Sequence, residues 1–272
     1  MIQTRLHARF PSVRFISQAE FNEYCRIAQP ALDTRYLHET SLTTREEAVV
    51  QLGTCAPCLR RAAFTSETAR WEKLADGRRV PEWSGALTCD CEDALGNRDR
   101  ALLHFALSQA GLRGWTRLLL FGPDVPASRR LQAEAGQTVR VASLQPGEDG
   151  PEDFRLPVPD ASCHLAIAAD YLHRVPPLDA ALSELRRVLA PGGSLVLTVP
   201  FRYRAARTTT RANLPAPGGR LPAEYRDAVH EIGWDVLDML RAAGFRQADV
   251  HSYWSNELGY LGSFNMLLHA VV

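Results

Sequence analysis

The stretch LPVPDASCHLAIAADYLHRVPPLDAALSELRRVLAPGGSLVLTVPF, residues 156–201, contains two apolar runs on either side of a segment with helical spacing. The first run, 163–170, is apolar almost throughout, as is typical of a strand buried on both faces of a sheet. Residues 177–193 carry leucine and alanine at helical intervals and end in Pro-Gly-Gly, which favours a helix stop. The second run is 194–201. The stretch therefore predicts a strand–helix–strand unit, the repeating element of a parallel sheet.

The same alternation continues on both sides of this unit. Upstream, the patterns predict an amphipathic helix from about residue 98, a buried strand over 116–122, a helix near 127–135 and a strand over 138–144. Downstream, they predict a helix over 233–245 and two end strands over 248–255 and 264–272. Because strands and helices alternate over about 170 residues, we expect an α/β fold with an open, mostly parallel sheet.

Composition is that of an ordinary globular protein. The 272 residues are 46% hydrophobic and 23% charged, and 31 basic side chains balance 31 acidic ones. A net charge of zero provides no general attraction for nucleic acid or an anionic membrane surface. No apolar run approaches the roughly 20 residues that span a bilayer, and residues 1–18 lack the apolar core of a secretory signal. We expect a cytoplasmic protein without nucleic-acid or membrane partners. The sequence does not determine its oligomeric state.

Residues 1–50 are expected to form an N-terminal helical segment. One helix is predicted to begin at Ser17, with Glu20 three residues later in a capping box, and to end near Pro30. A second helix is predicted over 41–53, where a glycine ends the pattern. Neither helix is long enough to bury itself, so both are expected to pack on the remainder of the chain.

Four of the six cysteines form two close pairs within residues 51–97, namely Cys55, Cys58, Cys89 and Cys91. In a chain with no recognisable export signal, such pairs favour a metal over disulfides. Four thiolates complete a tetrahedral zinc site and leave no position for water, so a zinc ion here would be structural. The alternative is four reduced cysteines buried as small hydrophobic side chains. We predict a zinc-binding module with four cysteine ligands over residues 51–97, followed by an α/β domain over residues 98–272.

The 156–201 stretch resembles the middle of class I S-adenosylmethionine-dependent methyltransferases. The resemblance is carried by the Leu-Pro turn at 156–157, by His173 in YLHRV and by LAPGGSLVLTVPF from Leu189. The segment IGWDVLDMLRAAGFRQADVHSYWSNELGYLG resembles a subfamily in which a zinc-like cysteine module precedes the core. The resemblance extends over about residues 50–272. It implies a Rossmann-like sheet, mostly parallel with an antiparallel C-terminal strand, and S-adenosylmethionine as methyl donor.

The resemblance also implies which residues would contact the cofactor. In the family an acid-x-Gly-x-Gly-x-Gly loop follows the first strand, and Gly122 aligns with its first glycine. Leu120 stands at the acid, while Asp124 and Pro126 stand at the later glycines. The second strand ends at Ser143, where the family has a ribose-binding acid. The candidate cofactor-contacting residues are Gly122, Pro123, Asp124, Ser143, Glu152, Asp153 and Asp170.

The departures from the family pattern bear on cofactor affinity. Each lost charge-assisted hydrogen bond weakens binding by about 1.5–3 kcal/mol, so two missing acids imply a loss of about a hundredfold or more. A carboxylate at Asp124 would also repel the carboxylate of the methionine part. Binding of S-adenosylmethionine is therefore left open by the sequence.

The candidate catalytic residues are His173, His230 and Glu231. His230 and Glu231 precede the Gly-Trp helix and could supply a general base, or form a surface or capping pair. His173 follows the predicted strand over 163–170, at whose carboxyl end open α/β sheets place ligand groups, or it is a packed structural histidine. Arg98 and Arg100 are expected to tie the cysteine module to the core.

Two functions of different class are consistent with these observations. The first is an O- or N-methyltransferase acting on a small-molecule or sugar-linked acceptor in a biosynthetic pathway, with the basic loop 201–211 near the acceptor. The second is a degenerate methyltransferase homologue that no longer binds S-adenosylmethionine. It would serve as a zinc-containing scaffold, as the partner of another enzyme, or as host to a different reaction. Because function resides in the site rather than the fold, the sequence leaves both open.

Overall fold

A computed structural model describes most of the chain. The described residues are 9–42, 49–66, 71–73, 79–81, 83, 86–122, 124–141, 155–175, 177–210 and 228–272. Four of the predicted site residues, Pro123, Ser143, Glu152 and Asp153, lie outside these ranges. No helix among the described residues is long and apolar enough to cross a membrane.

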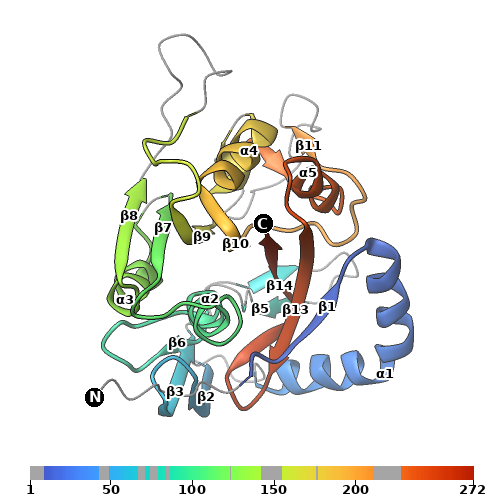
Figure 1. Ribbon diagram of the computed structural model, residues 1–272. Coiled ribbons are helices and arrows are strands. Elements are labelled where there is room, and N and C mark those ends of the chain that lie inside the picture. The colour runs from blue at the N-terminus through green and yellow to red at the C-terminus, as the bar shows by residue number, and fades with distance from the viewer. Residues whose placement is uncertain are drawn as a thin grey trace.

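The centre of the fold is a seven-stranded sheet (Figure 1). Its strands, in spatial order, are β1 (Ser12–Phe15), β13 (Gln247–Ser255), β14 (Tyr260–Val271), β10 (Leu189–Thr198), β9 (Cys163–Ala169), β7 (Arg117–Phe121) and β8 (Gln137–Val141). Strands β8, β7, β9 and β10 are mutually parallel, and β14 is antiparallel to β10. The predicted Rossmann-like sheet with an antiparallel C-terminal strand is confirmed.

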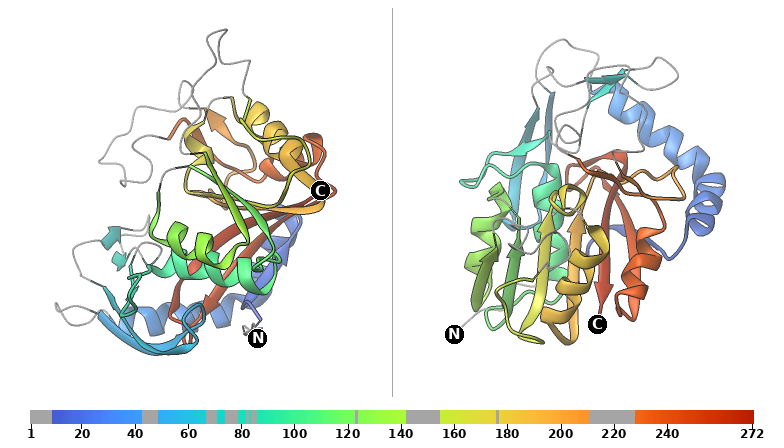
Figure 2. Two further views of the ribbon diagram at one scale, coloured as in Figure 1. Left: turned by 60° about the vertical axis from the view of Figure 1, so that its left-hand side comes forward. Right: turned by 90° about the horizontal axis from the view of Figure 1, so that it is seen from above.

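Helices cover both faces of this sheet (Figure 2). One face packs against α2 (Asn97–Ser108) and α3 (Pro126–Glu134), and the other against α4 (Leu178–Val188) and α5 (Val236–Ala242). The sheet separates two apolar cores, and successive side chains along a strand point into opposite cores. Leu119 and Phe121 of β7 enter the α4–α5 core, while Leu118 and Leu120 enter the α2–α3 core. A continuous apolar strand is therefore buried on both faces, as its sequence predicted.

The first described residues add a strand to the sheet. Residues 12–15 form β1, which pairs antiparallel with the edge of β13. We predicted only helices within residues 1–50, so this strand was not expected. The signal in the sequence was weak because the strand has only four residues and is partly exposed. Its place is decided by the free edge of β13, whose backbone groups would otherwise lack partners.

Helix α1 (Gln18–Ser41) begins where predicted and continues further. The Ser17 hydroxyl accepts a hydrogen bond from the Glu20 amide, and the Glu20 carboxylate accepts one from the Ile16 amide. The helix does not end at Pro30 but runs through it and bends midway (Figure 1). A proline inside a helix removes one backbone hydrogen bond and kinks the axis. Around this proline α1 is mostly exposed, so water can solvate the freed carbonyl.

The far end of α1 is held by a buried acid. The Glu39 carboxylate accepts hydrogen bonds from the Trp254 indole and the Gly262 amide, both at 2.8 Å. Burial nevertheless raises the pKa of this carboxyl. Helix α1 is thus anchored on the β13–β14 hairpin at its end and on the α5 side of the core, through Phe21, at its start.

The cysteine module is built from short antiparallel strands. Strands β2 (Val49–Cys55), β3 (Arg60–Ser66) and β6 (Thr88–Cys89) form one sheet, and β4 (Trp71–Lys73) pairs with β5 (Arg79–Pro81). The predicted helix over 41–53 is wrong for residues 49–53, which belong to β2 and pair with β3. Consecutive β-branched residues, Val49 and Val50, favour the extended backbone once a partner strand is available.

Gly53 marks where the module meets the β13–β14 hairpin. The amide of Thr54 donates to the Glu257 carbonyl at 2.8 Å, and a Cβ placed on Gly53 would lie 2.2 Å from that same oxygen. We expect Gly53→Ala to lower the free energy of unfolding by about 1–3 kcal/mol, because backbone would have to move. Gly114→Ala is the matched control, since no described atom lies within 4 Å of its Cβ position. Urea unfolding of both variants checks this, and equal stabilities would contradict it.

Candidate functional site

The carboxyl ends of β7, β9 and β10 bring a glycine, an acid and a threonine together. Gly122 follows β7, Asp170 follows β9, and Thr198 ends β10. The Asp170 amide donates to the backbone oxygen and to the hydroxyl of Thr198, at 2.9 and 3.1 Å. Open α/β sheets bind ligands outside the carboxyl ends of their strands. This edge is therefore the expected location of a binding site.

Gly122 has a backbone conformation that suits glycine. Its φ is +116°, and its amide donates to the Val141 carbonyl of β8 at 2.9 Å. A Cβ at this position would lie 2.7 Å from the Cβ of Tyr171, whose ring packs edge-on against Phe121 with centroids 5.1 Å apart. Glycine is therefore required here because the side chain of Tyr171 occupies the space that a Cβ at residue 122 would need.

Asp170 combines three unusual features. It has a positive φ of +49°, which is rare for a residue with a side chain. One carboxylate oxygen, Oδ2, forms an ion pair with Arg98 from the start of α2. The other, Oδ1, is buried and has no hydrogen-bond partner among the described residues. Strained backbone and unpaired buried acceptors concentrate at functional sites, so Asp170 is the strongest ligand-binding candidate on this edge.

The carboxylate of Asp124 is compensated by a neighbour. Arg140 on β8 donates to Asp124 Oδ1 at 2.7 Å and holds the pKa of that carboxyl below its usual range. Pro126 is the first residue of α3. The amide at this position makes no hydrogen bond within a helix, so a proline is well tolerated there. Both replacements of a family glycine thus have a structural explanation. Leu120, at the position of the family's acid, is 5% exposed and packs in the α2–α3 core.

His230 lies in β12 (His230–Glu231), which pairs with β11 (Thr209–Thr210). Its Nε2 lies 3.2 Å from the Val175 carbonyl, so this nitrogen carries the proton and donates. Its Nδ1 then accepts from the Thr210 hydroxyl at 3.3 Å. Burial lowers the pKa of His230, which keeps the ring neutral. Glu231 forms a 2.7 Å ion pair with Arg202.

His173 is fully buried in the short 3-10 turn η1 (Leu172–Arg174). Its carbonyl accepts from the Val229 amide at 2.9 Å, which joins η1 to the segment leading into β12. Its ring Nε2 accepts from Arg174 at 3.4 Å. The structure therefore brings His173 and His230 onto neighbouring segments. Their catalytic roles stay predictions.

Asp99, in the first turn of α2, was not singled out from the sequence. Burial and the nearby charge of Asp170 raise the pKa of its carboxyl to about 6, although Arg98 and the Gly96 amide act in the opposite direction. Asp99 is half-buried. Its proximity to the charges of Arg98 and Asp170 arises only in the folded chain, where the start of α2 lies beside the end of β9.

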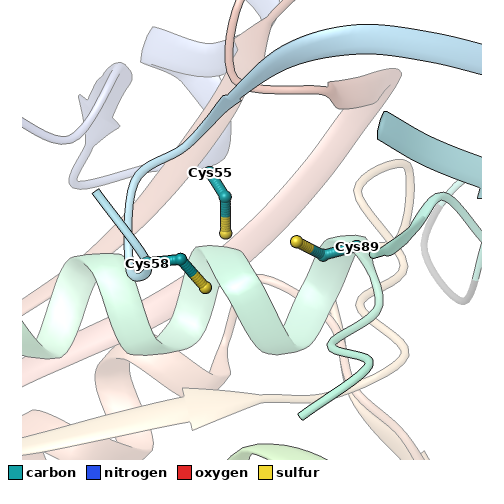
Figure 3. Close-up of side chains that lie close together, drawn as sticks. All are labelled: Cys55, Cys58 and Cys89. Carbon is teal, nitrogen blue, oxygen red and sulfur yellow. The ribbon is translucent and has the colours of Figure 1, made fainter. Parts of the chain in front are cut away.

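Three of the four predicted zinc ligands come together in the module. The sulfur atoms of Cys55, Cys58 and Cys89 lie within 4.8 Å of one another and point toward a common centre (Figure 3). Cys91, the fourth predicted ligand, is not in this group of three but packs against the same apolar cluster. The hydrogen bond to Cys55 and burial raise the pKa of Cys58, and burial raises the pKa of Cys89 to about 12. In the absence of a cation these thiols hold their protons, and a metal would displace them.

Arg100 is a fully buried cation beside this cysteine cluster. Its guanidinium donates to the backbone oxygens of Leu87, Leu258 and Gly259 at 2.6–3.1 Å. Its central carbon lies 3.9 Å from the centre of the Phe64 ring. Burial lowers the pKa of Arg100, and the charges of neighbouring groups, Cys55 among them, oppose that effect. Arg100 thus joins the module to the core, as expected, whereas Arg98 contacts Asp170.

A second polar cluster lies on β13 and β14. Asp249, His251 and His269 have side-chain donor atoms within 4.8 Å of one another. Burial lowers the pKa of His251 to about 3 and the pKa of His269 to about 4, so both rings are neutral. The sequence analysis did not identify these residues. The available signal was the alternation Asp-x-His in a predicted strand, with a further histidine in the last strand.

A hollow of about 410 Å³ with a mixed polar and apolar lining lies between the start of α1, the loop after β10 and α5. Its lining includes Arg207 from the predicted basic loop, Trp234, and the carboxylates of Asp235 and Asp238. The loop that contributes Arg207 leaves the carboxyl end of β10. The hollow presents a positive side chain, Arg207, and two negative ones, Asp235 and Asp238, to a small molecule.

The strand–helix–strand core matches a known protein family. The family model described as "Methyltransferase domain" matches residues 129–197, which run from α3 to β10. A segment of the reducing polyketide synthase Preu2 from Preussia isomera is 35% identical over 103 residues. That match covers 36% of this chain and 4% of the synthase, so the chain spans a small part of its curated relative.

Matches among solved structures have low identity. An S-adenosylmethionine-dependent methyltransferase from Thermotoga maritima is 15% identical, with a TM-score of 0.35, and the match covers 58% of this chain and 82% of that one. A chain in the complex of the Haloferax volcanii Trm112 methyltransferase activator with a methyltransferase is 15% identical, with a TM-score of 0.43, covering 64% and 93%. The domain match and the strand order confirm the predicted class I methyltransferase fold.

The raised pKa of Asp99 predicts a pH-dependent gain in stability for Asp99→Asn. The folded state binds this proton more tightly than the unfolded state, whose carboxyl titrates near 3.8. The favourable contribution is therefore complete below pH 4 and is lost as the pH rises through about 6. Relative to wild type, Asp99→Asn should become more stable by about 1–3 kcal/mol between pH 4 and pH 7. Urea unfolding at both pH values measures this, and a constant difference would refute it.

Proposed function

We propose that the protein is a methyltransferase that uses S-adenosylmethionine and methylates an oxygen or nitrogen of a small-molecule acceptor. One observation carries the proposal. Asp170 presents a buried carboxylate oxygen, unpartnered within the described part of the chain, at the carboxyl end of β9 next to the Gly122 turn. An unpaired acceptor of this kind suits a cationic or amine ligand group, and Arg98 holds the other oxygen in place.

The residues on this edge fit the methionine part of the cofactor. Asp170 Oδ1 can accept from the ammonium group, and the repulsion expected from Asp124 is offset by its ion pair with Arg140. Pro123 is assigned to the same loop as Gly122, Ser143 is assigned to the ribose, and Glu152 or Asp153 to the adenine. When bound, S-adenosylmethionine supplies a methyl group activated by its sulfonium centre.

The acceptor is assigned to the side of the loop after β10. Arg207 and the carboxylates of Asp235 and Asp238 suit a polar, small-molecule or sugar-linked acceptor, which the hollow of about 410 Å³ can hold. His230 is the proposed proton acceptor, through the Nδ1 atom that Thr210 now caps. Glu231 and His173 position this region through Arg202 and the Val229 contact. The local similarity to a polyketide synthase supports a biosynthetic role.

A second candidate function rests on Tyr171 and Leu120. Tyr171 occupies the space over Gly122, and the buried Leu120 replaces the carboxylate that the family places at this strand end. These two features favour a degenerate homologue in which the edge is closed to S-adenosylmethionine. Such a protein would act as a scaffold, as the partner of another enzyme, or through a different reaction.

The proposal includes a structural zinc ion on Cys55, Cys58, Cys89 and Cys91. A zinc ion with four thiolates carries a net charge of minus two, and the adjacent buried cation Arg100 would offset part of it. This pairing explains why an arginine without a described carboxylate partner is tolerated at this depth. Reduced cysteine ligands also favour a cytoplasmic location. The zero net charge disfavours nucleic-acid and membrane partners.

Calorimetric titration with S-adenosylmethionine and S-adenosylhomocysteine tests the cofactor proposal. Wild type should bind both, and Asp170→Asn should weaken binding by about 10- to 100-fold, since one charge-assisted hydrogen bond is lost. Glu23→Gln, an exposed change on α1, is the control and should bind as wild type does. Absence of heat up to millimolar ligand, from wild type with a cooperative thermal transition, would reject the methyltransferase and favour the second candidate.

Cobalt substitution tests the zinc proposal independently of activity. Protein loaded with Co²⁺ should show a sulfur-to-cobalt charge-transfer band, and Cys58→Ser should lose or strongly weaken it and unfold at lower temperature. Cys25→Ser, which changes a cysteine on α1, should retain the band. A wild-type protein that takes up cobalt without this band would show that the four cysteines are not ligands.

A further inference from the structure

We infer that Asp249, His251 and His269 form a second metal site, which binds a divalent ion of the zinc type and is distinct from the cysteine cluster. The three side chains converge on one face of the β13–β14 hairpin, with donor atoms within 4.8 Å of one another. The inference is independent of the proposed methyl transfer. It rests on strand register, unpaired buried atoms and the partners of each ring.

Strand register brings the three ligands together. Asp249 and His251 are two residues apart on β13, so their side chains share one face. His269 on β14 is the register partner of Asp249 in the antiparallel pair. Side chains that are directly opposite or diagonal in such a pair lie within reach of one another. Because both strands are held by neighbours on the other side, the set is fixed by the sheet rather than by a loop.

Two of the converging atoms have no hydrogen-bond partner in the part of the chain that the structure describes. Asp249 Oδ1 and His251 Nε2 are both buried and unpaired, in residues that are 1% and 6% exposed. Each such atom costs about 1–3 kcal/mol if it stays unpaired. A carboxylate oxygen and an unprotonated imidazole nitrogen both offer a lone pair to a cation, and one such atom from each residue of the cluster lies within 4.8 Å of the others. A bound cation satisfies both at once, which no hydrogen bond between two acceptors can do.

Each of the three side chains also has one atom that already makes a hydrogen bond. The Ser12 hydroxyl lies 3.1 Å from His251 Nδ1, and the Ser194 hydroxyl lies 3.2 Å from His269 Nε2. Asp249 Oδ2 accepts from Gln247. Metal-binding histidines characteristically use one nitrogen for the metal and engage the other in a hydrogen bond that orients the ring. This arrangement leaves His251 Nε2 and Asp249 Oδ1 directed at the ion.

The surroundings exclude water from one side of the cluster. The Phe105 ring of α2 packs edge-on against both imidazoles, with centroids 4.9 Å from His251 and 5.3 Å from His269. Arg14 on β1 approaches Asp249 Oδ2 at 3.6 Å from the exposed edge. The apolar wall strengthens electrostatic attraction for a cation, while the edge offers a route from solvent.

The ligand set identifies the class of ion. Two neutral imidazoles with one carboxylate suit Zn²⁺ and related first-row divalent ions, whereas Mg²⁺ and Ca²⁺ prefer oxygen ligands. Three protein ligands leave a position for water or another small ligand. Because the orienting partners come from β1 and β10, ion binding would also tie the edge strand β1 to the sheet.

The experiment compares metal content among full-length variants. Wild type, Asp249→Asn and His269→Gln are equilibrated with Zn²⁺, desalted, and measured for zinc per chain. We expect each variant to hold one equivalent less than wild type. His38→Ala, which removes a histidine on α1 outside the cluster, should match wild type. Ser12→Ala should retain the site with about 10- to 100-fold weaker affinity, since it removes only an orienting partner.

A titration with Co²⁺ separates this site from the cysteine cluster. The inferred site should take up one equivalent whose spectrum lacks a sulfur-to-cobalt charge-transfer band, and this result requires no variant to fold. Equal zinc content in wild type and both ligand variants would overturn the inference. So would a wild-type protein in which every bound cobalt shows sulfur charge transfer, or one that binds no cobalt at all.

Discussion

Arg100 is the residue on which the arrangement of the parts depends, because its buried guanidinium touches three of them. It rises from α2, donates to Leu87 in the cysteine module and to Leu258 and Gly259 in the β13–β14 hairpin, and covers the Phe64 ring. A desolvated cation is costly unless nearby negative groups compensate it. Here carbonyl dipoles provide part of the compensation, and the proposed zinc-thiolate centre would provide more. Removal of this side chain would leave three buried carbonyls unpaired.

The position of α2 in turn shapes the candidate cofactor edge. The helix that carries Arg100 also carries Arg98, which reaches Asp170 at the end of β9, and Asp99, whose carboxyl has a raised pKa. Helix α2 thus connects the cysteine module, through Arg100, with the Asp170 edge, through Arg98.

The edge itself shows how a familiar loop can change its chemistry while keeping its fold. Asp124 replaces a glycine but is paired with Arg140, and Pro126 replaces another but begins α3. Gly122 has a positive φ, and Tyr171 packs where a side chain at this position would lie, so two separate constraints favour glycine here. Each substitution is thus explained by a local contact. Among the described residues of this edge, the unpaired oxygen of Asp170 is what a ligand can still engage.

Local signals along the chain were sufficient to predict the order and type of the core elements, because apolar runs such as Arg117–Phe121 and the helical spacing in α4 involve only neighbouring residues. The cysteine pairs were visible for the same reason. Three features could be seen only in the folded molecule: the strand Ser12–Phe15, the passage of α1 through Pro30, and the meeting of Asp249 and His251 with His269. Each of them depends on surroundings that the local sequence does not contain, namely an open sheet edge, water on an exposed helix, and the register between two strands.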